Sequence, residues 1–515
     1  MSTPETAARR GSRRPAARTA APADRSRTYR HLSNPFTPLR VFSDDQVQAL
    51  HEAALSILEN QGMKVLSARA RQRYAAGGAL VDEQSLMVRM DRDLVSRCLA
   101  QAPREITLHA GTPSRDVPLS GTRVAFAPTS GAPNIIDLER GRRAGTLADF
   151  RDGIRLCQSF EVIQVLGAVT EPQDVPANVR HLEMTRSQLE LSDKIPFTFC
   201  RGDGQVADCF SMIRTAHGLS EAEFRARPYT YTIINTNSPL TLDVPMADGI
   251  IAFAAAGQLQ MVTPFTLAGA MAPVTLAGAL TLAHAEALAG LVLAQIVRPG
   301  APVVYGSFTS NVDMKSGSPA FGTPEYVKAQ FGAGQMARFL GLPWRSSNAT
   351  ASNVADAQAS YESQMSLWGA LLGGCNFMLH AAGWLESGLS ACYEKFILDV
   401  EMLQMFAEVF QPVPAAAPDL ALDAVAEVGP GGHFFGCAHT MERYRNAFYT
   451  PLVSDWRNYG SWLEDGAATA TERAGRIYKA TLREFTAPVR DAAVLGELDA
   501  FVAQRTAAGG SPPAG

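Results

Sequence analysis

Short apolar runs alternate with amphipathic segments along the central part of this 515-residue chain. The runs end in polar or aromatic residues, and the segments between them repeat their apolar positions with helical spacing, as in NVRHLEMTRSQLEL. Such alternation is typical of parallel βα units, in which each buried strand is followed by a helix. The eight runs lie at residues 124–135, 162–171, 195–203, 229–239, 264–273, 302–311, 342–351 and 377–386.

Eight strands with intervening helices over about 280 residues match the size of an eightfold (β/α) barrel of the TIM type. The main alternative is an open doubly wound sheet, which normally has fewer strands and a glycine-rich phosphate turn after the first one. No GxGxxG motif follows an early strand in this chain. We therefore predict an α/β protein with an eightfold barrel at residues 121–400.

Residues 31–120, before the barrel, are predicted to form an N-terminal α-rich subdomain on the outside of the main domain. Its first helix is expected to begin at Ser43, with Gln46 as the capping-box partner, and to end at Gly62. A second amphipathic region at Asp91–Gln101 precedes a strand-like stretch.

Residues 401–505, after the barrel, are predicted to form a C-terminal helical extension. A Pro/Ala-rich linker and an aromatic-rich unit precede its last helix, which we expect at Ala467–Phe485. The two ends of the chain, residues 1–30 and 506–515, contain few large apolar residues and are predicted to be disordered tails.

The folded part of the chain is acidic. The formal net charge is −4, but residues 1–30 hold eight Arg against Glu5 and Asp24, which leaves about −10 for the rest. This charge argues against nucleic acid as the main partner. The basic tail is open to three interpretations: a contact for an acidic partner, a transit-like segment, or a tail with no specific role.

The cysteines and the apolar segments indicate a cytoplasmic protein. Seven Cys occur without any CxxC pair, which fits a reducing compartment rather than a disulfide framework. Residues 264–297 form the longest apolar stretch, but Pro273, His284 and Glu286 interrupt it. We expect a packed strand-turn-helix there and no membrane contact.

Aromatic and acidic residues gather at the predicted strand ends, where (β/α) barrels carry their chemistry. Rings with a few negative charges suit a desolvated organic cation, because the ring quadrupole attracts a quaternary ammonium. The alternative is that these rings pack under loops, as large aromatics often do. The residues are Tyr305, Trp344, Tyr361 and Trp384, with Glu171, Asp313, Asp356, Glu362 and Glu386.

Two arginines near strand ends, Arg201 and Arg345, are candidates to bind a substrate carboxylate in bidentate fashion, although either can equally be a surface residue. His380 is expected in the middle of a strand, as an interior histidine rather than a base. The strands carry no HExxH or HxH pattern, so no catalytic metal is predicted. The spacing His433-x3-Cys437-x-His439 lies outside the barrel, and we interpret it as a hydrogen-bonded turn.

Several segments resemble the trimethylamine methyltransferase family. They are HEAALSILENQGMKV, GAMAPVTLAGALTLAHAEALAGLVLAQIVRPGAPVVYG, VADAQASYE and GPGGHFFGCAHT, and the resemblance runs from about His31 to Tyr478. It implies a cytoplasmic barrel enzyme that moves a methyl group from an amine to the cobalt of a separate corrinoid protein. Family members that use trimethylamine carry pyrrolysine in the barrel, and many relatives without it use quaternary amines such as glycine betaine. Here LPWRSSNATASN holds ordinary residues at that point, and we assign the position to Asn348, so a quaternary amine is the expected substrate.

The chemistry agrees with the resemblance. A quaternary ammonium needs no acid or covalent nucleophile, because the tertiary amine leaves neutral and the protein mainly orients one methyl group. We expect no tightly bound cofactor, cobalamin carried by the partner, and a homo-oligomer. The predicted catalytic residues are Asn348, Glu386 and Asp313, and the predicted substrate-binding residues are Tyr305, Trp344, Tyr361, Trp384, Arg201, Arg345 and Glu171.

Other functions remain open on the same residues. Within the enzyme class, the alternatives are a barrel methyltransferase with a folate acceptor and a lyase on the same scaffold. Outside it, the alternative is a non-catalytic subunit that binds or senses a quaternary amine for a partner protein.

Overall fold

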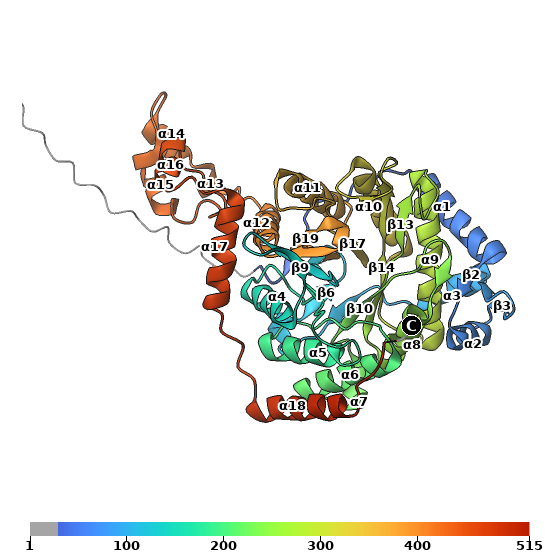
Figure 1. Cartoon of the computed structure of the whole chain (residues 1–515). Coiled ribbons are helices and arrows are strands. Elements are labelled where there is room, and N and C mark those ends of the chain that lie inside the picture. Colours follow the sequence, from blue (N-terminus) through green and yellow to red (C-terminus); the bar gives the residue numbers. More distant parts are fainter. Residues whose placement is uncertain (1–28, 514–515) are drawn as a thin grey trace, which may run out of the picture.

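The structure is a computed structural model that describes residues 29–513. The predicted basic tail, residues 1–30, therefore falls almost entirely outside the described residues. The centre of the molecule is a seven-stranded sheet in the order β1-β7-β18-β17-β14-β12-β10, surrounded by helices (Figure 1). Its strands are β1 (Leu32–Ser33), β7 (Arg123–Phe126), β18 (Phe377–Leu379), β17 (Trp344–Ser347), β14 (Val303–Gly306), β12 (Leu259–Val262) and β10 (Tyr231–Ile234).

All neighbouring pairs in this sheet are parallel except β1 with β7, and this confirms the predicted α/β class. The carboxyl ends of β7, β10, β12, β14, β17 and β18 consequently meet at one edge. The helices along the strands are α4 (Leu147–Ser159), α5 (Arg180–Leu191), α6 (Asp203–His217), α7 (Glu221–Ala226), α8 (Val244–Ala256), α9 (Leu276–Val297), α10 (Pro324–Leu340), α11 (Ala357–Leu372) and α12 (Tyr393–Val409).

The assigned strands of the described residues do not by themselves make the predicted closed barrel. The second and third predicted runs, residues 162–171 and 195–203, make single parallel bridges instead of strands. In the second run, the side-chain oxygen of Gln164 accepts a hydrogen bond from the Phe126 amide at 2.7 Å. This side-chain acceptor stands in place of a backbone carbonyl. In the third run, Pro196 has no amide hydrogen to donate to a ladder.

The fifth strand of the sheet lies earlier than predicted. Residues 264–273 were expected to supply it, but the strand is β12, which ends just before Thr263-Pro264. Because proline cannot donate to a ladder, Pro264 separates β12 from the next strand. That strand, β13 (Phe265–Ala268), pairs with β15 (Phe308–Val312), which pairs in turn with β16 (Pro319–Ala320) in a small sheet of its own.

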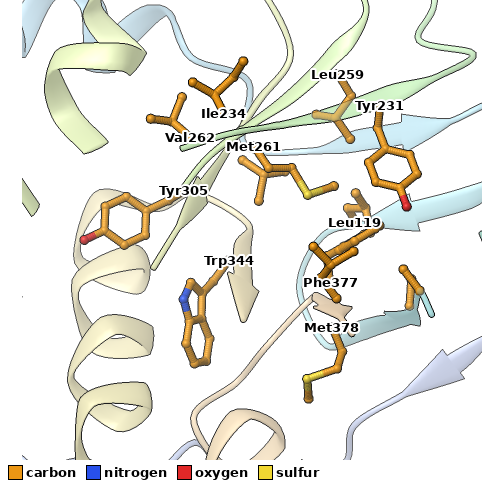
Figure 2. Close-up of a cluster of buried hydrophobic side chains, with 14 of the residues drawn as sticks. Leu119, Tyr231, Ile234, Leu259, Met261, Val262, Tyr305, Trp344, Phe377 and Met378 are labelled. Atoms are coloured by element: carbon orange, nitrogen blue, oxygen red, sulfur yellow. The ribbon is translucent and has the colours of Figure 1, made fainter. Parts of the chain in front are cut away.

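Side chains of the short central strands alternate between two sides. Tyr305 of β14 is paired in register with Trp344 of β17. Figure 2 shows these two rings beside a helix on one side of the strands, with Tyr231, Met261 and Phe377 on the other. Because successive residues of a strand face opposite ways, Arg345 is directed away from the side that Trp344 occupies.

Helix α9 is the one helix of residues 29–513 that is long and apolar enough to cross a membrane. Its residues from Ala279 to Gln295 are all buried, among α1, α3 and α8 and the central strands. This burial agrees with the expected packed helix, which includes the buried His284 and Glu286.

The N-terminal unit begins as predicted. Helix α1 (Asp44–Ser56) has the Ser43–Gln46 capping box, and a π-helical turn at Ile57–Gln61 ends at Gly62, whose φ is 77°. The unit is less α-rich than predicted, because short strands lie between its helices. They are α2 (Ala68–Ala76) and α3 (Arg92–Gln101), with β2 (Met63–Val65), β3 (Leu80–Asp82), β4 (Met87–Arg89), β5 (Ile106–Leu108) and β6 (Val117–Leu119), a 3-10 turn at Pro113–Arg115, and β11 (Thr241–Leu242) pairing with β2.

The C-terminal extension leaves the body after α12 and returns to it. Short helices α13 (Ala417–Leu420), α14 (Leu422–Val428), α15 (Ala438–Arg443) and α16 (Tyr459–Glu464) and a 3-10 turn at Phe434–Gly436 stand off the body, before α17 (Ala470–Arg483) packs along α12 (Figure 1). Helix α18 (Ala492–Ala507) then packs on α5 and α6.

The prediction of a disordered tail from residue 506 is wrong for the described residues. Arg505 binds the carboxylate of Asp208 at 2.8 Å, and the amide of Ser511 donates to the Asn178 carbonyl at 2.8 Å. Backbone hydrogen bonds hold the small polar residues of this end in place. Such bonds to distant segments cannot be predicted from amino-acid composition.

Candidate active site

A cavity of about 290 Å³ lies at the carboxyl ends of the central strands. In parallel α/β folds, ligands bind at this edge. The residues that line the cavity stand at or just beyond the ends of the strands. They are Ser130 after β7, Phe199 and Arg201 in the run at residues 195–203, Asn235 after β10, Phe265 in β13, Phe308 in β15, Arg345 in β17, His380 after β18 and Trp384 in β19. The strand β19 (Trp384–Leu385) belongs to a side sheet with β20 (Ser390–Cys392), β8 (Asn134–Asp137) and β9 (Gly141–Ala144), and the 3-10 turn Glu386–Gly388 follows β19.

Aromatic rings form one wall of the cavity. The ring centroid of Phe308 lies 5.2 Å from Phe265 and 6.1 Å from Trp384, the latter in an edge arrangement at 76°. The indole N–H of Trp384 donates to the Thr350 carbonyl at 3.1 Å, which fixes the ring. A second pair, Phe197 and Phe199, meets at 4.7 Å. Ring faces arranged in this way attract an organic cation.

Arg345 brings a positive charge that has no counter-ion in the part of the chain that the structure describes. Its side chain is fully buried, and its Nε and Nη1 atoms have no hydrogen-bond partner among the described residues. Burial lowers the pKa of Arg345 to about 10, since the charged form loses its hydration. Its Cζ lies 5.6 Å from the Phe308 ring centroid. A buried charge left unpaired is costly, so the cavity is suited to an anionic group that pairs with it.

Arg201, in contrast, is already paired. It makes a bidentate ion pair with Glu171, whose Oε2 accepts from Nη2 at 2.9 Å, and its Cζ lies 4.5 Å from the Phe199 ring centroid. Glu171 also accepts from Arg180 at 2.6 Å. Burial alone would raise the pKa of Glu171, but these two arginines outweigh it and lower the pKa. Glu171 thus anchors Arg201 from outside the cavity lining.

His380 lies directly beyond β18, in the cavity wall, and the expectation that it sits in mid-strand is wrong. Its φ is 58°, a costly conformation for a residue with a Cβ, and such strain is concentrated at functional sites. Its ring centroid is 4.0 Å from Trp384, and Nδ1 has no hydrogen-bond partner among the described residues. Burial, followed by the charge of Arg345, lowers the pKa of His380 well below its usual value.

We expect ligand affinity at this cavity to stay constant between about pH 6 and 8. His380 is neutral across this range, because its pKa is depressed, and protonating it would add repulsion beside Arg345 only at lower pH. Titration calorimetry with a quaternary amine at several pH values measures this directly. A change in affinity centred near pH 6.5 would contradict it, and the variant His380→Gln, which removes the titrating group, serves as the control.

Three of the predicted ring residues do not line this cavity. Tyr305 is buried against α9, where its hydroxyl is 3.0 Å from Nδ1 of His284. Trp344 lines a different cavity of about 280 Å³, with Arg338 and Asn376, at the amino ends of the strands. Tyr361 is exposed on α11.

The predicted acids are bound elsewhere. Asp313 is exposed and accepts from the Ser316 hydroxyl at 2.6 Å within a turn. Glu386 pairs with Arg142 at 2.8 Å. Asp356 caps α11 at the Ala359 amide.

Two further predicted polar residues, Asn348 directly after β17 and Glu362 on α11, are held in place by hydrogen bonds. Glu362 accepts from the backbone of Ala351 at 2.8 Å. Asn348 is fully buried; its Nδ2 donates to the Ala381 carbonyl at 3.2 Å, and its Oδ1 has no partner among the described residues.

Sequence reasoning missed the ring residues Phe199, Phe265 and Phe308. Phe308 follows the end of β14 by two residues, and Phe199 stands in the FTFCRG segment. Both could therefore have been found by the rule that residues at strand ends carry the chemistry. Neither is polar, and that is why a search for polar and indole groups passed them over. Among residues 29–513 no group of three or more His, Cys, Asp or Glu side chains is placed to hold a metal ion, and His433, Cys437 and His439 do not form one.

Comparison with known proteins identifies the family. The family model described as trimethylamine methyltransferase matches residues 8–510. The chain belongs to the trimethylamine methyltransferase family. This confirms the resemblance seen in the sequence and the expected enzyme class, a methyltransferase.

Two relatives in the family cover nearly the whole chain. The glycine betaine methyltransferase of Desulfitobacterium hafniense (strain Y51) is 36% identical over 90% of this chain and 97% of its own length. The trimethylamine methyltransferase of Desulfitobacterium hafniense (strain DSM 10664 / DCB-2) is 30% identical over 86% of this chain and 90% of its own length. The solved monomethylamine methyltransferase of Methanosarcina barkeri has a TM-score of 0.46 at 10% identity, with 88% of this chain and 94% of that chain covered.

Proposed function

We propose that this methyltransferase takes a methyl group from a quaternary amine that bears a carboxylate, of the glycine betaine kind, and passes it to the cobalt of a partner corrinoid protein. The observation that carries the proposal is the buried Arg345, unpaired, beside the ring wall of Phe308 and Trp384. Rings and a free guanidinium in one cavity complement the two ends of a betaine. The similarity to a glycine betaine methyltransferase supports the same substrate class.

The residues of the cavity orient the substrate and do not need to activate it. The ring wall holds the trimethylammonium group, and Arg345 pairs with the carboxylate in its planar fork. Proton transfer is not required, because the departing tertiary amine is neutral. When the partner is present, its corrinoid supplies a reduced cobalt nucleophile. The neutral His380, beside Trp384, fits this scheme as part of the ring wall.

Of the three predicted catalytic residues, we retain Asn348 alone. It is buried directly after β17, with a carbonyl oxygen that has no partner among the described residues. Glu386 and Asp313 have partners of their own and are not assigned a role. Trimethylamine fits the cavity less well than a betaine, because it carries no carboxylate for Arg345.

We also propose that the central strands close into the eightfold barrel at residues 121–400. Its support is the set of contacts between β7 and β10. The amide of Gln164 donates to Phe126 at 3.0 Å, the amide of Leu166 to Ile195 at 2.9 Å, and the amide of Thr198 to Tyr231 at 3.1 Å. If these segments are counted as two further strands, they connect β10 back to β7. The sheet already connects the same two strands through β12, β14, β17 and β18, so the series of strands closes on itself. A cytoplasmic location and the flanking units at 31–120 and 401–505 complete the proposal.

The test is methyl transfer to reduced corrinoid protein, followed by the absorbance of the methyl-cobalt product. We expect product with glycine betaine and none with trimethylamine or tetramethylammonium at equal concentration. Binding of glycine betaine by calorimetry without transfer to any acceptor would contradict the proposal and favour a sensing subunit. Transfer to a folate acceptor alone would favour the other methyltransferase class.

A further inference from the structure

Two opposite charges are buried behind the segment that leads into Trp384. Lys395 and Asp399 stand one turn apart on α12, neither side chain has exposed surface, and the ammonium contacts the carboxylate. The ammonium also donates to the hydroxyl of Ser363, on α11, at 2.8 Å. A buried ion pair loses so much hydration that replacing both charges by apolar groups is often neutral or even stabilising. Stability alone therefore does not explain this pair.

The other carboxylate oxygen of Asp399 connects the pair to the cavity wall. It accepts a hydrogen bond from the backbone amide of Gly383 at 2.8 Å. Gly383 is the last of residues 380–383, which we call the turn, and the turn leads directly into Trp384 of the cavity lining. Burial raises the pKa of Asp399, whereas Lys395 and the Gly383 amide both favour the charged carboxylate. A charged acceptor binds an amide more strongly than a neutral one does.

The turn needs an anchor because its backbone conformation is costly. Its first residue, His380, has a φ of 58°, and its last, Gly383, has a φ of 92°, which glycine adopts readily. A Cβ atom on Gly383 would lie 3.5 Å from Cβ of Phe396, so the turn packs directly on the first turns of α12. The hydrogen bond to Asp399 holds the turn against this helix.

We propose that Asp399, paired with Lys395, is a positioning residue for the quaternary ammonium and acts through Trp384. By holding the Gly383 amide, the carboxylate fixes the backbone of the next residue, whose ring contacts the cation. A binding wall works only when supporting residues hold its side chains close to their productive geometry. This inference rests on the proposed function, because it takes the Trp384 ring as a contact of the cation.

The experiment measures glycine betaine binding by calorimetry on the full-length chain, with no corrinoid present. Asp399→Leu/Lys395→Met removes both charges and the acceptor together, so that no lone charge remains buried. We expect it to bind betaine about three- to tenfold more weakly, a part of what the ring contact contributes. Asp399→Asn/Lys395→Met is the matched control. It also lacks both charges, but its amide oxygen can accept from Gly383 and should recover most of the lost affinity.

A double-mutant cycle with Trp384→Ala then shows whether Asp399 acts through the ring. In the Trp384→Ala background, the leucine double variant should weaken binding no further, because the ring to be positioned is absent. Asp399→Glu keeps both charges but displaces the carboxylate by one methylene. It repeats the cycle in a chain with an intact ion pair, and the same pattern is expected. Circular dichroism checks that each variant is folded.

Each other outcome counts against the role of Asp399. Losses that add in the cycle would overturn it, because Asp399 would then support the cavity as a whole and not the ring. Wild-type binding in the leucine double variant, or equal weakening in the asparagine one, would overturn it as well. If Trp384→Ala binds betaine as the wild type does, the proposed cation site and the role of Asp399 fail together. Additive losses refute the role of Asp399 alone.

Discussion

Replacing Arg345 by leucine should lower kcat/KM for glycine betaine by roughly thirtyfold to several thousandfold. Removing one partner of a buried charge pair costs about 2–5 kcal/mol, and each 1.4 kcal/mol is a factor of ten. The loss is expected in turnover and not in folding, because the guanidinium has no counter-ion among residues 29–513. Thermal unfolding of the variant should therefore occur at the wild-type temperature or above it.

Two controls separate a carboxylate contact from a general defect in the variant. Arg345→Lys keeps the charge but loses the planar fork, and we expect it to fall between the wild type and Arg345→Leu. Binding of tetramethylammonium, which has no carboxylate, should be no weaker in the leucine variant than in the wild type. Equal losses for both ligands would show that Arg345 supports the cavity wall instead of pairing with substrate.

Replacing Trp384 by alanine should weaken glycine betaine binding by about ten- to thirtyfold. A desolvated cation over an indole face gains up to about 2 kcal/mol, and tryptophan is the best ring for this contact. Trp384→Phe keeps a ring in place and should lose less. Calorimetry measures the dissociation constants, with no corrinoid needed.

The matched control is Trp344→Phe, in the other tryptophan that sequence analysis placed in the cage. Trp344 lines the cavity at the amino ends of the strands, so its variant should bind betaine as the wild type does. The phenylalanine keeps most of the buried volume at this fully buried position. Equal weakening in both variants, or none in Trp384→Ala, would rule out a cation site at the Trp384 wall.

Several local features were within reach of the sequence because they depend on neighbours along the chain. The Ser43–Gln46 capping box joins residues three positions apart, and its two hydrogen bonds are present. Most of the predicted apolar runs form strands of the central sheet. A buried parallel strand is itself a short apolar run, so it is visible in the local sequence. The run at residues 195–203 failed to become a strand, and a single proline within it is visible in the sequence, whereas the run at residues 162–171 contains none.

The pairing of charges depended on contacts between distant segments. Glu386 pairs with Arg142, 244 positions away, and Glu171 with Arg201, 30 positions away. Sequence analysis treated both acids as free to meet a cation, whereas each is neutralised by an arginine. The same arrangement leaves Arg345 without a carboxylate from the described residues, a feature that no local pattern reveals.

The sequence by itself determined the class of fold, the family and the edge of the strands where chemistry is expected. The tertiary structure alone decided which side chains face the cavity. A strand alternates its faces with every residue, so an error of one position in a four-residue strand exchanges the two sides. Trp344 and Arg345 are neighbours in the chain, and for this reason Trp344 lies on the helix side of the strands while Arg345 faces the candidate active site.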